Sequence, residues 1–172
     1  ERGDRYIDWD EAQQIAGLSD EETEHIKLIT LDVNKFITSE ASGAGLKNED
    51  GKIELAFDLT RKVMLVDAIG TPDECRFSAN GIPISKEFAR IFYRKTNWYK
   101  AVQQAKEEAK RAGIADWKTL VRERPPGLKD ELKEVISNLY MTCANALTRK
   151  KWFDAPKLGE IIGQLESLQS RF

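Results

Sequence analysis

The stretch DGKIELAFDLTRKVMLVDAIGTPDECR, residues 50–76, organises the rest of the chain. It contains two apolar runs separated by a polar break, and the second run ends on Asp67. A Gly-Thr-Pro-Asp loop follows and carries Arg76. Short apolar runs bounded by turn residues are typical of strands, so we expect an antiparallel hairpin over about residues 50–67. Acids and bases therefore converge on β-structure here, rather than on the solvated face of a helix.

Two carboxylates of this hairpin are candidate metal ligands. Side chains alternate along a strand, and a four-residue loop from Leu59 to Lys62 would place Glu54 directly opposite Asp67, roughly 5 Å apart at Cβ. Like charges so placed repel unless a cation or a proton lies between them. The two carboxylates, with Lys52 beside them, therefore predict a site that binds a divalent metal and a phosphate. Mg²⁺ suits such a site, because it takes one or two protein carboxylates as ligands. The alternative is that Asp67 ends the strand and Glu54 faces solvent.

The order of the motifs resembles the signature region of the SAICAR synthetase family, the phosphoribosylaminoimidazole-succinocarboxamide synthases of purine biosynthesis. The family pattern is Asp-x-Lys-apolar-Glu-Phe-Gly, a second strand ending in Asp-Glu, then Ser/Thr-Pro-Asp-x-x-Arg and a helix with Lys-x-x-x-Arg. The resemblance covers roughly residues 4–112. The matching segments are Asp50-Gly-Lys52-Ile-Glu54, Leu-Val-Asp67, Thr-Pro-Asp73-Glu-Cys-Arg76 and Lys86-Glu-Phe-Ala-Arg90.

The chain departs from this pattern at three places. Leu55-Ala56 replaces the family's Phe-Gly, which is a packing change. Ala68 stands where the family usually has Glu, and so removes an acid beside the predicted metal site. Residues 47–49 are Lys-Asn-Glu, where the family has an apolar strand. The last departure predicts either a first strand that starts late or a turn over residues 48–51.

The family's N-terminal lobe carries a Gly-Lys-Ala-Lys element that grips the ATP phosphates, and this sequence contains no such element. The chain also begins at Glu1, without an initiator methionine. These two observations lead us to expect the C-terminal half of a larger protein, which works together with an N-terminal ATP-binding lobe.

The resemblance implies an ATP-dependent carboxylate–amine ligase that joins aspartate to carboxyaminoimidazole ribonucleotide, with ATP and Mg²⁺ as cofactors. It also implies roles for the matching residues. These are nucleotide binding for Lys52, Glu54 and Asp67, with Glu54 and Asp67 as metal ligands, catalysis for Lys52 and Asp73, and substrate binding for Asp73, Arg76, Lys86 and Arg90.

The residues themselves leave simpler interpretations open. Asp73 and Arg76 are three residues apart, so they can pair with each other and staple the loop. Lys86 and Arg90 share a helix face, an arrangement that holds one phosphate but is also ordinary on a helix surface. Asp4 is a further substrate-binding candidate by position alone.

Composition sets wider limits. The chain has 172 residues, of which 41% are hydrophobic and 33% charged, which fits one folded domain or one domain with a helical appendix. Its formal charge of −2 argues against a dedicated nucleic-acid binder. No apolar run approaches the ~18 residues of a membrane span. Two distant cysteines fit a reducing cytoplasm, and a single histidine, His25, supplies neither a His metal cluster nor a triad.

The periodicity predicts an α+β fold: an antiparallel hairpin or sheet packed by helices in residues 1–113, then an all-α extension in residues 114–172. Ser19 and Glu22 form a capping box that opens a helix over 19–41. Gly70, Pro72, Gly81 and Pro83 mark 68–84 as an ordered loop. Further helices are expected over about 10–16, 85–95, 96–112 and 128–150, and from Pro156 onward. The last two read as a helical hairpin that packs on the lobe or on a partner.

Two other functions compete with the ligase. One is a non-catalytic or regulatory module that keeps the family scaffold, which Ala68 and the helical extension favour. The other is a related ligase with a different carboxylate substrate. The sequence leaves the oligomeric state open, a homo-oligomer included.

Overall fold

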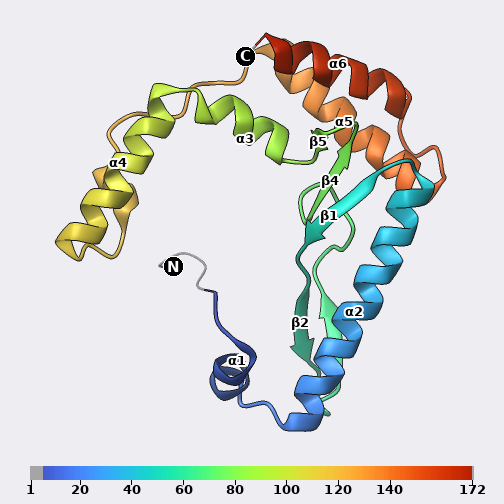
Figure 1. The fold of residues 1–172 in the computed structure, drawn as a ribbon, viewed down its shortest axis with the longest axis vertical. Helices are drawn as coiled ribbons and strands as arrows, with labels where there is room; N and C mark the ends of the chain where they lie inside the picture. Colours follow the sequence, from blue (N-terminus) through green and yellow to red (C-terminus); the bar gives the residue numbers. More distant parts are fainter. Residues whose placement is uncertain (1–5, 172) are drawn as a thin grey trace.

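The computed structural model describes residues 6–171 and has the predicted α+β fold (Figure 1). A three-stranded antiparallel sheet has the order β1-β4-β5, and β2 and β3 form a separate two-stranded ribbon. The candidate Asp4 lies outside the described residues. The strands are β1 (Lys47–Gly51), β2 (Glu54–Phe57), β3 (Val63–Val66), β4 (Cys75–Ala79) and β5 (Ile82–Ile84).

The predicted helices all form, and local signals account for their ends. Ser19 and Glu22 make the expected capping box, with the Glu22 amide 3.1 Å from Ser19 Oγ. Gly17 and Gly113 end their helices in the left-handed conformation. No helix in residues 6–171 is both long and apolar enough to cross a membrane. The helices are α1 (Trp9–Ala16), α2 (Asp20–Gly43), α3 (Glu87–Arg94), α4 (Asn97–Ala112), the 3₁₀ helix η1 (Trp117–Leu120), α5 (Asp130–Thr148) and α6 (Leu158–Ser170).

The three-stranded sheet overturns two expectations. Residues 47–51 are neither a turn nor a late start but strand β1, which pairs with β4. Residues 68–84 are not simply a loop, because β4 and β5 form a hairpin within them. Asn80 and Gly81 connect these strands with φ of 51° and 78°, the backbone that a two-residue hairpin turn requires. An Asn-Gly pair is the strongest short hairpin signal, so this turn was readable from the sequence.

The β2–β3 ribbon forms as predicted, but its register differs by one residue. Glu54 pairs with Val66, not with Asp67. The loop is shorter than expected, because the Asp58 amide bonds to the Lys62 carbonyl at 2.9 Å. The loop therefore has three residues, Leu59 to Arg61. Arg61 has a left-handed φ of 63°, as the last residue of a three-residue hairpin loop commonly does. The expectation of directly opposed Glu54 and Asp67 carboxylates is therefore wrong.

The hydrophobic core joins the sheet to the helical extension. Phe77 on β4, Ile84 on β5 and Phe88 on α3 are almost fully buried. They belong to one cluster with the inner faces of α5 and α6, including Leu139 and Leu165. The helical hairpin therefore packs on the lobe, and segments on both sides of the predicted boundary at residue 113 share this core. By contrast, α4 and η1 pack on each other and lead away from the sheet (Figure 1).

Candidate functional site

Lys52 lies between β1 and β2 and is held by two carboxylates. Its Nζ is 2.6 Å from Glu54 Oε1 and 3.2 Å from Glu74 Oε2. The hydrogen bond to Glu54, and then that to Glu74, raises the pKa of the ammonium group. The lysine therefore remains charged and keeps Glu54 in place. Glu74 had no predicted role, and no sequence signal placed it beside Lys52.

Asp67 follows the end of β3 in an unusual conformation. Its φ is 68°, and its Oδ1 accepts a 2.7 Å hydrogen bond from the Ala68 amide. Within residues 6–171, no group of three or more His, Cys, Asp and Glu side chains is arranged to hold a metal. Carboxylate oxygens suit Mg²⁺, which needs only one or two protein carboxylates. A Mg²⁺ ion bound through one carboxylate fits this arrangement. A Mg²⁺ ion shared by Glu54 and Asp67 directly across the ribbon does not, because the two residues are not paired.

Arg76 lies on β4 rather than in a loop and pairs with a residue on the neighbouring strand. It stands directly opposite Asp50, and its Nε is 2.6 Å from Asp50 Oδ1. A second contact from Nη2 to Oδ2 makes the grip bidentate. The hydrogen bond from Arg76 lowers the pKa of the Asp50 carboxyl group. Arg76 thus does not pair with Asp73, and the predicted loop staple is wrong.

Asp73 lies at the tip of a tight turn and contacts the helical extension instead. The Glu74 and Cys75 amides both bond to the Thr71 carbonyl, at 3.1 and 2.8 Å. These bonds hold the turn and leave Asp73 exposed. The Tyr140 hydroxyl on α5 donates a 2.9 Å hydrogen bond to Asp73 Oδ1. Sequence reasoning missed Tyr140, because 67 residues separate the two partners.

The start of α3 brings the remaining candidates to the same region. The Lys86 amide donates to the Pro72 carbonyl at 3.1 Å, which joins α3 to the Asp73 turn. Arg90 lies one turn further on, 3.5 Å from Glu87. The positive charge of Arg90 also favours a lower pKa of the Tyr140 phenol. Lys86 and Arg90 thus lie on or next to the helix that starts beside the Asp73 turn, and Arg76 lies on the strand that follows this turn.

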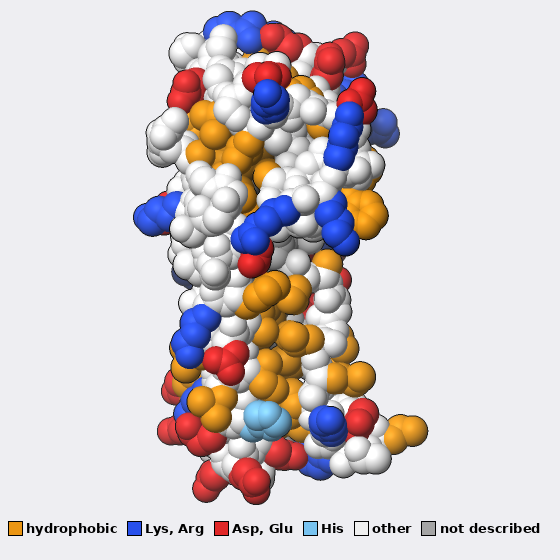
Figure 2. Space-filling view, turned by 90° about the vertical axis from the view of Figure 1, so that its right-hand side faces the viewer, with side chains coloured by type: hydrophobic (Ala, Val, Ile, Leu, Met, Phe, Trp, Pro, Cys, Tyr) orange, Lys and Arg blue, Asp and Glu red, His pale blue; other side chains and the backbone are white. Residues whose placement is uncertain are grey.

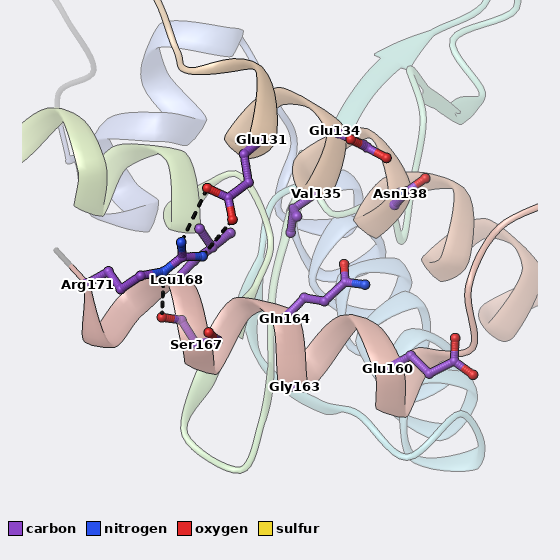
Figure 3. A pocket seen from close by; sticks show the side chains of 10 residues that line it. All are labelled: Glu131, Glu134, Val135, Asn138, Glu160, Gly163, Gln164, Ser167, Leu168 and Arg171. Carbon is purple, nitrogen blue, oxygen red and sulfur yellow. Dashed lines mark hydrogen bonds and ion pairs between the residues drawn. The ribbon is translucent and has the colours of Figure 1, made fainter.

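Of two pockets in the structure, one is lined by predicted site residues and the other is not. One, of about 280 Å³, lies between α2 and β1 and is lined by Asp50 and Lys52 among others. The other, of about 640 Å³, lies between α5 and α6 (Figure 3). Glu131 and Arg171 pair across it at 2.7 Å, and none of the predicted site residues lines it. The first pocket therefore adjoins the candidate site and the second does not.

Comparisons with known proteins support the resemblance. A family model described as SAICAR synthetase matches residues 1–111. A relative from Archaeoglobus fulgidus, provisionally named a phosphoribosylaminoimidazole-succinocarboxamide synthase, is 51% identical over 96% of this chain and 48% of its own length. A phosphoribosylaminoimidazole-succinocarboxamide synthase from Thermoplasma acidophilum is 30% identical over 88% of this chain and 51% of its own.

A solved structure was also found, a type-2 SAICAR synthetase in complex with ADP. It aligns with a TM-score of 0.48 and 24% identity, over 73% of this chain and 48% of that one. The chain spans about half the length of the curated relatives it matches. The Archaeoglobus alignment covers 165 residues and so extends into the helical extension.

Proposed function

Since the chain belongs to the SAICAR synthetase family, we propose that it is the C-terminal half of an ATP-dependent ligase that joins aspartate to carboxyaminoimidazole ribonucleotide. The observation that carries the proposal is the gathering of the family's motif residues around one region. Lys52 and Glu54 follow β1, Arg76 lies on β4, and Asp73 with Lys86 lies where the next turn meets α3.

The reaction needs an activated carboxylate. A carboxylate oxygen of the ribonucleotide attacks the γ-phosphorus of ATP, and ADP leaves. The aspartate amine then attacks the acyl carbon and loses a proton, and inorganic phosphate leaves. Both steps build negative charge on phosphate, which positioned cations stabilise. Bound Mg²⁺ would neutralise part of that charge.

The residues divide between ATP and the ribonucleotide. Glu54 and Asp67 would contact the nucleotide, with its magnesium ion bound through one of the two carboxylates rather than shared across the ribbon, and Lys52 keeps Glu54 oriented. Asp67 holds a left-handed backbone, a strained state that is common at functional sites. On the other side, Arg76 holds Asp50 through Nε and Nη2, and its remaining Nη1 group would contact a carboxylate or phosphate. Lys86 and Arg90 add positive charge from one helix face.

Exposed apolar side chains on α2 and on both faces of the ribbon support a partner lobe. Leu28 and Leu31 on α2 are 60% and 54% exposed, and Met64 and Leu65 on β3 are 46% and 40% exposed. Figure 2 shows apolar side chains gathered along the lower part of this side of the molecule. The same ribbon carries Glu54, so a lobe that grips ATP must approach it. We expect the N-terminal ATP-binding lobe to cover this surface.

The cysteines bear on the cellular compartment of the enzyme. Cys75 and Cys143 are both free and buried, which fits a reducing compartment such as the cytoplasm. The competing function is a non-catalytic module on the same scaffold, which Ala68 in place of an acid favours. A related ligase that uses another carboxylate is the remaining alternative.

Reconstitution tests the proposal. The isolated chain should release no ADP from ATP, ribonucleotide and aspartate. The same chain, fused to the part of the Archaeoglobus relative that it does not cover, should form ADP and the succinocarboxamide in equal amounts. Turnover by the chain alone would refute the half-enzyme interpretation. A fused protein that binds ATP but forms no product would favour the non-catalytic module. Product formation with another carboxylate only would identify the related ligase.

A further inference from the structure

The hydrogen bond between Tyr140 and Asp73 connects the helical extension to the candidate site. It is 2.9 Å long and joins α5 to the turn before β4. Leu139 and Cys143, on the same helix, are fully buried in the core. Tyr140 itself is half-buried and packs against this cluster. The phenol therefore presents its hydroxyl group from a well-packed base.

We propose that Tyr140 is a positioning residue for the ligase, whose hydroxyl group orients the Asp73 carboxylate toward the ribonucleotide. The inference rests on the proposed function, which places Asp73 among the substrate-binding residues. With Oδ1 held by Tyr140, Oδ2 is free to accept a hydrogen bond from a ribose hydroxyl or an amine of the substrate. The extension is then part of the substrate site.

The protonation state of the phenol suits this role. Burial, followed by the hydrogen bond to Asp73, raises the pKa of Tyr140. The hydroxyl group therefore stays protonated at neutral pH and acts as the donor. The positive charge of Arg90 on α3 opposes this rise in pKa, but its effect is smaller than those of burial and the hydrogen bond. Asp73 thus accepts its hydrogen bond from a neutral donor.

A purely structural role explains the contact less well. The Asp73 turn is already held by backbone bonds to Thr71 and by the Lys86–Pro72 bond. The extension is already held by its buried side chains. Tyr140 thus adds little to either element, but it does set the rotation of an exposed carboxylate.

The helix also offers a matched control. Thr142, two residues further along α5, donates a 2.9 Å hydrogen bond to the Pro156 carbonyl. It is buried and ties α5 to the segment before α6, away from Asp73. Thr142→Val removes a hydroxyl group from the same helix without touching the Asp73 turn. Any effect that comes from loosening α5 should therefore appear in this variant as well.

The test measures KM and kcat of the complete ligase carrying Tyr140→Phe, Thr142→Val, Asp73→Ala, or Tyr140→Phe together with Asp73→Ala. We expect Tyr140→Phe to raise KM for the ribonucleotide about two- to tenfold, the range of one lost hydrogen bond, with kcat and KM for ATP little changed. Thr142→Val should leave KM unchanged while lowering the melting temperature. In the Asp73→Ala background, which has no side-chain acceptor for Tyr140, Tyr140→Phe should have no further effect.

Three results would overturn the inference. They are an unchanged KM in Tyr140→Phe, an equal rise in Thr142→Val, or full additivity of the Tyr140 and Asp73 changes. A wild-type ligase that makes no succinocarboxamide would instead remove the proposed function, and this inference with it. The wild-type assay therefore separates the two failures.

Discussion

The two β-structures of this chain differ in how completely they are buried. In the three-stranded sheet, Cys75 and Phe77 on β4 are 2% and 1% exposed, and α3, α5 and α6 complete the core around that sheet. In the β2–β3 ribbon no strand residue is fully buried. A two-stranded ribbon alone is marginally stable in water. The part that carries the predicted nucleotide residues is therefore the part that most needs a partner.

The long helix α2 shows the same contrast along its own length. Its C-terminal part buries Ile37 and Ala41 against the sheet, whereas its N-terminal part buries only Thr23. The ribbon is fastened to this N-terminal part by Arg61, whose Nε is 2.6 Å from Glu22. Arg61 Nη2 also donates to the Gly17 carbonyl at 2.7 Å. Polar contacts at a loop thus hold the ribbon, whereas packing holds the sheet.

Core truncation should show the largest difference between the two regions. Leu139 is fully buried beneath the sheet, so Leu139→Ala should cost about 2–5 kcal/mol of unfolding free energy. Leu65→Ala on the ribbon removes a side chain that is 40% exposed and should cost less than about 1 kcal/mol. Urea denaturation of the isolated chain measures both. Equal losses would show that the ribbon belongs to the same cooperative core.

Substitution of Arg76 tests whether the three-stranded sheet contributes a residue to the substrate site. Arg76→Lys keeps the charge but loses the planar, bidentate grip. In the complete ligase we expect kcat/KM for the ribonucleotide to fall tenfold or more, about 1.4 kcal/mol of transition-state stabilisation. The melting temperature should hardly change, because Arg76 and Asp50 are both exposed.

Arg111→Lys is the control for this change, because Arg111 pairs with Glu107 on α4 in another exposed contact. A lowered melting temperature with unchanged kinetics would remove Arg76 from the substrate site and leave it a purely structural cross-strand partner.

Loss of the Arg61 contacts should loosen the ribbon alone. In Arg61→Ala, amide hydrogen exchange should quicken several-fold for β2 and β3, because both the Glu22 pair and the bond to the Gly17 carbonyl disappear. The amides of β4 and β5 should keep their protection. Exchange measured by NMR on the isolated chain gives both values. Uniform loss of protection would contradict the separation of the two regions.

The pH dependence of stability should give the smallest signal, and it concerns the sheet. Arg76 lowers the pKa of folded Asp50, so the pair stabilises the fold above the unfolded carboxyl pKa of about 3.9. That stabilisation declines as pH falls through the lower, folded value. The urea midpoints of wild type and Asp50→Asn should therefore differ at pH 7 and converge below about pH 4. A constant difference across this range would show that Asp50 does not titrate with the fold.

The helices and the motif residues were predictable because their signals are local. A capping box at Ser19 and Glu22, and a glycine at residue 17 or 113, mark helix ends within a few residues. The Asn80-Gly81 turn between β4 and β5 is an equally local signal. The ribbon register was not predictable with the same ease, because it depends on Arg61 adopting a left-handed backbone, which is uncommon for that residue type.

By itself, then, the sequence determined the helix ends, the β2–β3 hairpin and the motif that relates the chain to its family. Only the tertiary structure decided which charged residues meet. Asp50 faces Arg76 because β1 pairs with β4, and Tyr140 reaches Asp73 because α5 packs against α2 and shares the hydrophobic core of the sheet. Local signals act between residues a few positions apart, whereas these contacts depend on how apolar faces far apart in the chain are buried together.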